Sequence, residues 1–385
     1  MKVLVVSTVP THPTTSGSGM FIKSYCGLLK EMGHEVFFLY VPFYSFREEN
    51  RAKQKECVRV MSQIWDEHFF TFKSSVFDRI KEFLLNKYHH CFSNDYYGCD
   101  DRYPLCLDYY VNKLNKKHAF DACIVNYYWL SKLLPKVNVP RKGMIAHDSF
   151  TYNNERNGVK SRLNLTPSEE AKAMQRCPTI FAMQEEEKIL FQRYAPHSKV
   201  LTSFCNYKYI EQAVIGNHNL VYLSSGFYLN VNGLKWFVDE IFPSILSVFP
   251  DCKLIIGGTL CREVPQYKFH SNIELLGLID DPAHLYSLGD VAINPTYQGT
   301  GLKIKTFEAM AYDKVTMVHP HSVNGIFDKS NAPIFVSEKA VEWVDFLKKI
   351  WVEDKTKISE IKTENKDYIK RMNTYIINQF KDFLD

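Results

Sequence analysis

The stretch that decides the fold extends from Asn294 to Ala311 and has the sequence NPTYQGTGLKIKTFEAMA. It follows the apolar run 291–293, which is typical of a buried strand, and it continues through Gly299 and Gly301 into a helix that we predict over 302–312. Glycines let a backbone approach a ligand closely, and the free N–H groups at the start of a helix bind anions. This succession of strand, glycine-rich loop and helix therefore predicts a phosphate site in a Rossmann-like unit.

The predicted helix carries an apolar face and a charged pair. Its apolar face contains Ile304, Phe307 and Ala311. The pair is Lys305 with Glu308. A phosphate at the helix start would gain about 0.3–1 kcal/mol from the helix dipole and about 1.5–3 kcal/mol from a charged hydrogen bond to lysine. The carboxylate one turn further in suits the two hydroxyls of a ribose. The alternative is a surface ion pair worth about 0.2–0.5 kcal/mol, which the position after a strand and two glycines disfavours.

Alternating strands and helices occupy both halves of the chain. In the first half we predict strands over 3–6, 35–41, 121–126, 143–146, 179–183 and 199–203, with a helix over 21–32. In the second half we predict strands over 220–224, 253–257, 273–276, 291–294 and 315–318, with helices over 234–249 and 283–288. This pattern predicts an α/β protein with two Rossmann-like, doubly wound domains that face each other across a cleft. We place their bounds at 1–208 and 209–365, and we expect an amphipathic C-terminal helix over 366–385 to pack back on the first domain.

Residues 45–117 interrupt the first domain with a pattern that mixes charged and aromatic residues. We predict a largely helical insertion that caps this domain. Its aromatic residues either pack into a small core of the insertion, line an acceptor groove or touch a membrane. These residues include Trp65, Phe69, Phe70 and Phe72. The balance of acidic and basic residues over 47–100 argues against a strong electrostatic membrane anchor.

Composition excludes several classes of protein. The 385 residues are 45% hydrophobic and 23% charged, as in ordinary globular proteins, and 47 basic against 43 acidic residues give a net charge of +4, too small for a nucleic-acid-binding protein. No apolar run approaches the roughly 18–20 residues that span a bilayer, and the N-terminal pattern fits a strand better than a signal peptide. We therefore expect a cytoplasmic protein and leave peripheral contact with the inner face of the membrane open. The ten scattered cysteines are expected to be reduced, and the patch around Cys91, Cys99 and Cys106 lacks zinc-like spacing.

The sequence resembles the GT-B glycosyltransferases of the retaining, family-4-like type, the glycosyl transferases group 1. The resemblance rests first on the stretch 299–311, on VTMV at 315–318 and on Gly325 beyond it. IELLG at 273–277, LY at 285–286 and DVAI at 290–293 stand in the order of that family. Near the N-terminus, MKVLVV at 1–6, SGSG at 16–19 and GHEV at 33–36 also match. The match covers both ends of the chain and fades within 45–117.

The resemblance implies roles for individual residues of the second domain. Glu308 would bind the ribose of a nucleotide-sugar, whereas Lys303 and Lys305 would neutralise its diphosphate. Gly226 would lie beside the diphosphate, with Asn232 nearby. Backbone N–H groups of the glycine-rich loop would contact phosphate or sugar. By this resemblance, the donor-binding residues of the loop would be Gly299, Thr300 and Gly301.

In the first domain the resemblance implies contacts to the transferred sugar. The loop Gly17–Ser18–Gly19 would close over that sugar, and His147 would contact it and act with Lys303 and Lys305 in catalysis. Taken alone, a histidine such as His147 is more often a structural residue of the core, and a Gly-Ser-Gly sequence is more often a turn. The combination of motifs favours the functional interpretation.

Two positions depart from the family pattern. Many members have a second glutamate eight positions before the one that binds ribose, where this chain has Thr300. Many also have Arg-Lys after the equivalent of Gly226, where this chain has Phe227. The contact to the donor sugar must therefore differ. The sequence leaves the nucleotide (UDP or GDP) and the sugar open.

The implied activity is the transfer of a sugar from a nucleoside-diphosphate sugar to an acceptor hydroxyl, with retention at the anomeric carbon and without a metal or other cofactor. The setting would be the synthesis of a polysaccharide, lipopolysaccharide or other glycan, with a glycan or lipid-linked acceptor and an oligomeric state that the sequence leaves open. The alternatives are a non-catalytic partner subunit of the same fold, a two-domain nucleotide-sugar epimerase and a Rossmann oxidoreductase. The first is motivated by Thr300, and the last lacks a third glycine after Gly17 and Gly19.

Overall fold

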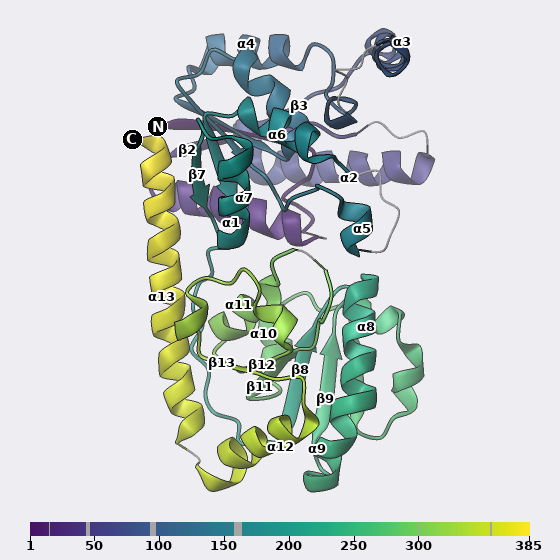
Figure 1. Cartoon of the computed structure of the whole chain (residues 1–385), viewed down its shortest axis with the longest axis vertical. Helices are drawn as coiled ribbons and strands as arrows, with labels where there is room; N and C mark the ends of the chain where they lie inside the picture. The colour runs from purple at the N-terminus through teal and green to yellow at the C-terminus, as the bar shows by residue number, and fades with distance from the viewer. Residues whose placement is uncertain (15, 44–46, 93–97, 158–163, 300, 355) are drawn as a thin grey trace. The chain divides into compact units, whose positions relative to one another are not determined.

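The computed structural model describes residues 1–14, 16–43, 47–92, 98–157, 164–299, 301–354 and 356–385. The chain divides into two compact units (Figure 1). The first contains Met1–Asn206 together with Tyr375–Asp385, and the second contains Tyr207–Thr374. Among the described residues, no helix has both the length and the apolar character to cross a bilayer.

The first unit contains a seven-stranded parallel sheet in the order β3-β2-β1-β4-β5-β6-β7. The strands are β1 (Lys2–Ser7), β2 (Glu35–Tyr40), β3 (Phe69–Thr71), β4 (Ala122–Asn126), β5 (Arg141–Ile145), β6 (Thr179–Ala182) and β7 (Lys199–Thr202). The helices are α1 (Gly17–Glu31), α2 (Glu48–Trp65), α3 (Val76–Phe92), α4 (Leu107–His118), α5 (Asn153–Asn157), α6 (Pro167–Gln175) and α7 (Glu185–Tyr194). The strand order reverses between β1 and β4, which is where open α/β sheets bind ligands.

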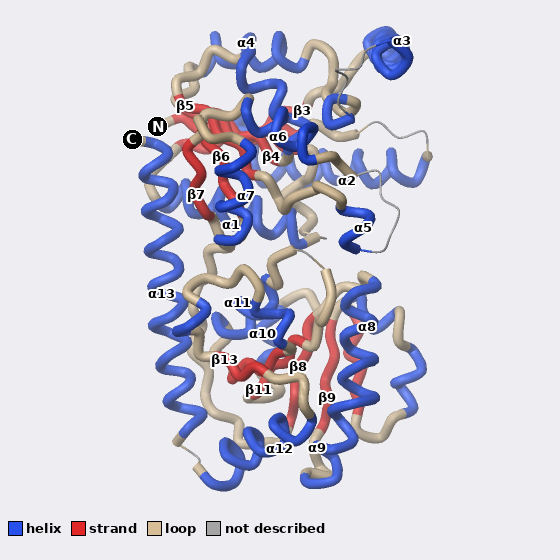
Figure 2. The backbone as a smooth tube through the Cα atoms, viewed as in Figure 1, coloured by secondary structure: helices blue, strands red, loops and turns tan. Residues whose placement is uncertain are grey.

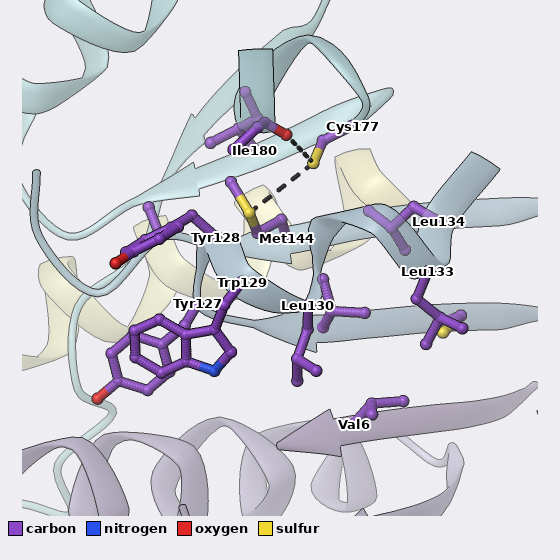
Figure 3. Close-up of a cluster of buried hydrophobic side chains, with 14 of the residues drawn as sticks. Val6, Tyr127, Tyr128, Trp129, Leu130, Leu133, Leu134, Met144, Cys177 and Ile180 are labelled. Atoms are coloured by element: carbon purple, nitrogen blue, oxygen red, sulfur yellow. Dashed lines mark hydrogen bonds between the residues drawn. The ribbon is translucent and has the colours of Figure 1, made fainter. Parts of the chain in front are cut away.

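Both faces of this sheet are covered, which explains why its strands are continuously apolar. On one face the 3₁₀ helix η3 (Tyr128–Lys136) places Leu130 and Leu133 in a cluster with Met144 and Ile180 (Figure 3). On β6, Phe181 stacks on Phe380 near the C-terminus, with ring centroids 4.9 Å apart. The C-terminal residues are thus part of the core of the first unit.

The described residues of the segment 45–117 are largely helical, but they do not form a separate cap. Residues 69–71 form β3, which extends the sheet beside β2. Aromatic and β-branched residues favour strands, and the sequence Phe-Phe-Thr fits this preference. Trp65 lies against Phe38 with ring centroids 5.2 Å apart, and Phe72 is buried in the main core. The expectation of a core belonging to the insertion alone is therefore wrong for these aromatic residues.

Two helices begin earlier than the apolar periodicity predicts. α1 begins at Gly17 instead of Phe21, because Ser16 caps it and its Oγ accepts a hydrogen bond from Gly19 N at 3.1 Å. In the second unit, α8 begins at Tyr228 instead of Leu234, so that Asn232 lies within a helix and not in a loop. The first turn of α1 consists mainly of small residues, and in α8 Asn230 and Asn232 interrupt the apolar residues, so neither start shows a clear apolar period.

The second unit contains a six-stranded parallel sheet in the order β10-β9-β8-β11-β12-β13, whose strands are red in Figure 2. The strands are β8 (Asn219–Leu223), β9 (Lys253–Gly257), β10 (Ile273–Gly277), β11 (Val291–Asn294), β12 (Val315–Val318) and β13 (Ile334–Val336). The helices are α8 (Tyr228–Trp236), α9 (Phe242–Val248), α10 (Pro282–Tyr286), α11 (Ile304–Ala311) and α12 (Ala340–Lys348). Alternate residues of β8 face opposite clusters, with Leu220 and Tyr222 in the larger and Val221 in the smaller. The sheet is therefore buried on both faces.

Helix α13 (Lys357–Leu384) begins earlier than the predicted start at 366. Its first turns belong to the second unit, where Ile358 and Ile361 join the larger cluster. From Tyr375 onward the helix belongs to the first unit, where Phe380 and Phe383 are buried. Both ends of the helix are thus built into a hydrophobic core.

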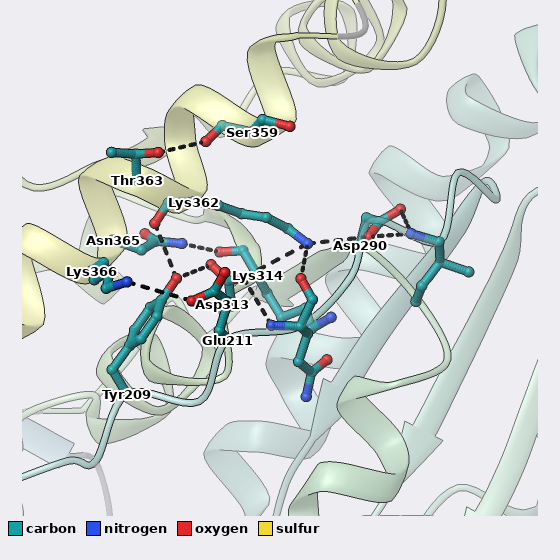
Figure 4. A network of polar contacts seen from close by, with 12 residues as sticks. Tyr209, Glu211, Asp290, Asp313, Lys314, Ser359, Lys362, Thr363, Asn365 and Lys366 are labelled. Atoms are coloured by element: carbon teal, nitrogen blue, oxygen red, sulfur yellow. Dashed lines mark hydrogen bonds and ion pairs between the residues drawn. The ribbon is translucent and has the colours of Figure 1, made fainter.

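A buried network of charges joins α13 to the rest of the second unit (Figure 4). Lys362 Nζ lies 3.8 Å from carboxylate oxygens of both Asp290 and Asp313. Asp290 also accepts hydrogen bonds from the backbone N–H groups of residues 215 and 216, and Asp313 accepts one from Tyr209 Oη at 2.5 Å. The network ties the segment 209–216, two strand-flanking aspartates and the helix to one another.

Candidate active site

The second sheet reverses its strand order between β8 and β11, so a ligand is expected at their carboxyl ends. The segments that follow these strands come close together. A Cβ on Gly233 of α8 would lie 2.8 Å from Pro295 O and 2.9 Å from Thr296 Cα, so only glycine allows this approach. The close approach of helix α8 to the loop after β11 therefore depends on the absence of a side chain at residue 233.

Lys305 lies at this switch point and bridges the two segments. Its Nζ donates a hydrogen bond to Asn230 Oδ1 on α8 at 2.6 Å and lies 5.6 Å from the centre of the Tyr222 ring. Asn230 is held in turn by Ser225, whose backbone O accepts from Asn230 Nδ2 at 3.0 Å. Desolvation lowers the pKa of Lys305 to about 8, although the Glu308 carboxylate acts to raise it. The lysine is therefore a partly desolvated cation at the carboxyl end of the sheet, and not a member of a surface ion pair.

Glu308 lies one turn further along α11 and is only 7% exposed. Its Oε2 accepts a hydrogen bond from Tyr286 Oη at 3.4 Å, and the Tyr286 ring stacks on Tyr312 with centroids 4.7 Å apart. Burial raises the pKa of Glu308 to about 7, while Tyr286 and Lys305 act to lower it. A buried carboxylate with a single tyrosine partner can accept further hydrogen bonds, as binding of two ribose hydroxyls requires.

The glycine-rich loop is held by two side chains that reach its carbonyl groups. Lys303 Nζ donates to Gly299 O at 3.0 Å and to Gly301 O at 2.7 Å. His321 Nε2 donates to the same Gly299 O at 2.6 Å. Gly299 has a φ of +94°, a conformation that favours glycine, and Thr300 lies outside the described residues. The side chain of Lys303 therefore holds the loop by binding two of the loop's carbonyl oxygens.

The other two predicted donor-site residues of this unit lie on or before α8. Gly226 donates its N–H to Thr259 Oγ1 at 2.9 Å. Asn232 lies two residues after Asn230, and residues two apart on a helix point in nearly opposite directions. The structure therefore brings Asn230, and not Asn232, to Lys305.

In the first unit, His147 follows β5 and lies beside the switch point between β1 and β4. Its Nε2 lies 2.8 Å from Asn126 Oδ1, at the end of β4. Asn126 Nδ2 donates to Val6 O at 3.2 Å and to Tyr25 Oη at 2.8 Å, which fixes the orientation of the amide. His147 Nε2 must therefore be protonated, and it donates a hydrogen bond to Asn126 Oδ1. Burial lowers the pKa of His147 to about 3, so the imidazole is neutral at physiological pH.

Aromatic stacking links His147 to the start of α1. The imidazole stacks on the Tyr127 ring at 4.2 Å, and Tyr127 Oη donates to Ser18 Oγ at 2.6 Å. The structure thus brings Ser18 and His147 to one site through a tyrosine. Gly17 and Gly19 lie with Ser18 in the first turn of α1, where backbone N–H groups can bind an anion.

The backbone around His147 is strained. Tyr127, His147 and Asp148 have φ values of +73°, +54° and +80°, which are unusual for residues other than glycine. Such conformations cost about 1–3 kcal/mol each and are frequent at functional sites. Nearby, Glu187 accepts hydrogen bonds from the N–H groups of Ser149 and Met183 and holds the loop after β5.

Sequence reasoning missed several residues of both sites, among them Asn126, Tyr127, Asn230, Tyr286 and His321. For Asn126 a signal was available, since a polar residue that ends a buried apolar strand in an α/β sheet lies at the ligand edge. For His321 no such signal exists, because it reaches Gly299 from a 3₁₀ turn that follows β12.

Potential metal ligands are not gathered at either site. Within the described residues, no group of three or more histidine, cysteine, aspartate or glutamate side chains could hold a metal ion. All ten cysteines lie within the described residues, and none of them forms a disulfide bond.

The chain is similar to known proteins in part of its sequence and in its fold. Residues 217–351 match the family model described as Glycosyl transferases group 1, and this range includes the glycine-rich loop and α11. The fold of the whole chain is that of the GT-B proteins. HepE of Anabaena, solved in complex with UDP, superposes with a TM-score of 0.63 at 12% identity, covering 100% of this chain and 99% of that one. Sucrose-phosphate synthase of Thermosynechococcus elongatus superposes with a TM-score of 0.64 at 11% identity, covering 99% and 98%.

The family match over 217–351 and the fold with two Rossmann-like domains agree with the resemblance seen in the sequence. Among curated proteins the chain is similar to an uncharacterized 44.6 kDa protein from the cps region of Klebsiella pneumoniae. The two are 22% identical over 342 residues, which is 80% of each chain.

Proposed function

We propose that the protein transfers a sugar from a nucleoside-diphosphate sugar to the hydroxyl of a glycan or lipid-linked acceptor, with retention at the anomeric carbon. The observation that carries the proposal is the placement of Lys305 and Glu308. Both are desolvated, both lie at the sheet's switch point, and both belong to the segment that matches the family model. A cation and a carboxylate one helical turn apart suit a diphosphate and the ribose attached to it.

The reaction breaks the bond between the anomeric carbon and the diphosphate oxygen, and it forms a bond from that carbon to the acceptor oxygen. The proton of the acceptor hydroxyl goes to the departing phosphate, from whose side the acceptor attacks. Because the leaving diphosphate gains negative charge, stabilising it is the main catalytic task. Lys305, the first turn of α11 and Lys303, once released from the loop carbonyls, would supply that stabilisation without a metal ion.

His147 would hold the transferred sugar instead of acting as a strong base. Its Nε2–H is committed to Asn126, so its Nδ1 is the atom left to accept a hydrogen bond from a sugar hydroxyl. A pKa of about 3 makes the imidazole a weak proton acceptor at neutral pH. Ser18 and the first turn of α1 would complete this part of the site.

The relatives support a place in the synthesis of a polysaccharide. The Klebsiella pneumoniae relative comes from a cps region, and HepE was solved with UDP. We therefore propose a surface or capsular polysaccharide as the product and UDP-sugars as the donors to test first.

The first experiment is a thermal-shift panel of nucleoside diphosphates and nucleotide-sugars, because a ligand that binds only the folded state raises its Tm. We expect Glu308→Ala to weaken binding of the best nucleotide at least about tenfold, or ~1.4 kcal/mol. The matched control is Glu360→Ala, because Lys357 and Glu360 form an exposed ion pair with the same spacing. Unchanged nucleotide affinity in folded Glu308→Ala would remove this residue from the site.

The second experiment tests the reaction. Purified protein is incubated with the donor so identified and with candidate acceptors, and the anomeric configuration of the product is determined by NMR. Transfer with retention that persists in chelator supports the proposal. Loss of transfer in chelator, with recovery only on addition of Mg²⁺ or Mn²⁺, contradicts the metal-free mechanism. Nucleotide binding without transfer or donor hydrolysis points instead to a non-catalytic subunit.

A further inference from the structure

Helix α3 packs on the first unit through its polar side. Glu82 Oε1 accepts a hydrogen bond from Leu105 N at 2.5 Å, and Asn86 Nδ2 donates to Asp101 O at 3.2 Å. Asp78 accepts hydrogen bonds from Ser75 N and Oγ at the start of the helix. These three polar residues are half-buried, so the side that faces the protein is hydrophilic.

The outward side of α3 is apolar. Its large exposed apolar residues are Val76 (72% exposed), Phe77 (76%), Ile80 (55%), Phe83 (66%), Leu84 (59%), Tyr88 (59%) and Phe92 (76%), with Leu85 (37%) less exposed at the margin. With 3.6 residues per turn, residues 76, 80, 83 and 84 lie within an arc of about 100°, opposite residues 78 and 82. A helix of a water-soluble domain normally buries such a stripe, and α3 has the reverse orientation. A contiguous exposed apolar surface of this kind marks an interaction site.

The charges of α3 indicate what covers this surface. Its exposed charged side chains are Lys81 and Lys87, and both lie within or beside the apolar side. Its two carboxylates, Asp78 and Glu82, lie on the opposite side of the helix, where Glu82 accepts a hydrogen bond from Leu105 N and Asp78 accepts one from Ser75 Oγ at the start of the helix. The outward surface therefore combines apolar and cationic groups, which suits a bilayer with anionic lipid headgroups. A second copy of the same surface would bring like charges together.

We propose that α3 is an interfacial helix, which docks the first unit on the surface of an anionic phospholipid bilayer. Its apolar residues enter the boundary between headgroups and acyl chains, while the two lysines extend their ammonium groups to lipid phosphates. This surface differs from the aromatic residues 65–72, which are built into the sheet and the core. The docking does not depend on the donor site, so either proposal can fail without the other.

The test is flotation of the full chain with two kinds of vesicle, phosphatidylethanolamine with phosphatidylglycerol, and phosphatidylcholine alone. We expect binding to the anionic vesicles and little binding to phosphatidylcholine. The triple variant Phe77→Ser, Phe83→Ser and Leu84→Ser should bind anionic vesicles with a partition coefficient that is lower by about tenfold or more. The reason is that each apolar side chain contributes to binding when it leaves water for the bilayer. All three positions are exposed, so the variant keeps its fold, and an unchanged Tm verifies this. The matched control is Phe269→Ser, which alters a side chain 89% exposed on the second unit.

A second pair of variants tests the charges. Lys81→Glu with Lys87→Glu should reduce binding to anionic vesicles and leave the weak binding to phosphatidylcholine unchanged. Two outcomes overturn the proposal. One is equal vesicle binding, or none, for the wild-type chain and the triple variant. The other is a concentration-dependent dimer in sedimentation experiments that the triple variant abolishes, which would assign the surface to a second copy of the chain.

Discussion

Glu308 and Lys305 have pKa values that approach each other, at about 7 and about 8, because burial disfavours the charged form of both. The carboxylate is the form that accepts hydrogen bonds from ribose hydroxyls, and the ammonium is the form that attracts a diphosphate. The Glu308 carboxylate becomes protonated below about pH 7, and the Lys305 ammonium loses its proton above about pH 8. The proposed donor site thus has both charges only in a narrow interval of pH.

We therefore expect the affinity for a nucleotide-sugar to be greatest between about pH 7 and 8 and to fall on both sides. Glu308→Gln should remove the acidic limb of this profile, and Lys305→Met the alkaline limb. Isothermal titration with an intact nucleotide-sugar measures it, because its diphosphate diester does not titrate in this range. A wild-type affinity that stays constant from pH 6 to 9 would contradict the assignment.

The same burial predicts an effect on stability. The pKa of Glu308 is about 7 in the folded state and 4.5 in the unfolded state. The folded state therefore holds this proton more tightly, so the group's contribution to the free energy of unfolding is complete below pH 4.5 and is lost as the pH rises through about 7. The upper limit of this loss is about 3 kcal/mol. Glu308→Gln should therefore raise the Tm more at pH 8 than at pH 5, in thermal denaturation without ligand. An equal change at both pH values would show that the carboxylate is not desolvated.

At the scale of elements, α8 and the loop after β11 are held together where Gly233 lacks a side chain. Gly233→Ala should force them apart, reduce the free energy of unfolding by about 1–3 kcal/mol and weaken nucleotide binding, since Asn230 on the same helix positions Lys305. The matched control is Gly27→Ala in α1, where a Cβ would meet nothing within 4 Å. That substitution should stabilise the chain by about 0.5–1 kcal/mol. Urea unfolding measures both variants, and equal effects would contradict the close approach.

The buried strands could be predicted from sequence because their apolar runs are uninterrupted, as in 291–294, which matches β11. β3 was missed because a three-residue edge strand, 69–71, lies within a segment of helical periodicity. In the proposed donor site, Lys305 and Glu308 were predicted from their place after the glycines. Asn230 was not found, because its contact with Lys305 joins residues 75 apart in sequence that only the tertiary fold brings together.

At the scale of the whole molecule, the charge network of Lys362 holds α13 to the second unit. Lys362→Met would leave Asp290 and Asp313 buried without this cation, which typically costs about 3–5 kcal/mol. The control is Lys366→Met, which removes an exposed pair with Glu211 worth about 0–1 kcal/mol. Urea unfolding followed by tryptophan fluorescence compares the two variants. Equal stability of the variants would show that the network contributes nothing through its charges.

The division of α13 between two cores has a consequence for biosynthesis. The ribosome synthesises residues 1–206 before residues 375–385. In the folded chain, however, Phe380 and Phe383 of the later segment pack against Phe181 of the earlier one. At a translation rate of about 5–20 residues per second, the first unit remains without these C-terminal side chains for a time on the order of ten seconds. During that interval the second unit, which is continuous in sequence, can fold on its own. The sheet face around Phe181 meanwhile stays exposed, and chaperones that bind apolar surfaces can recognise it.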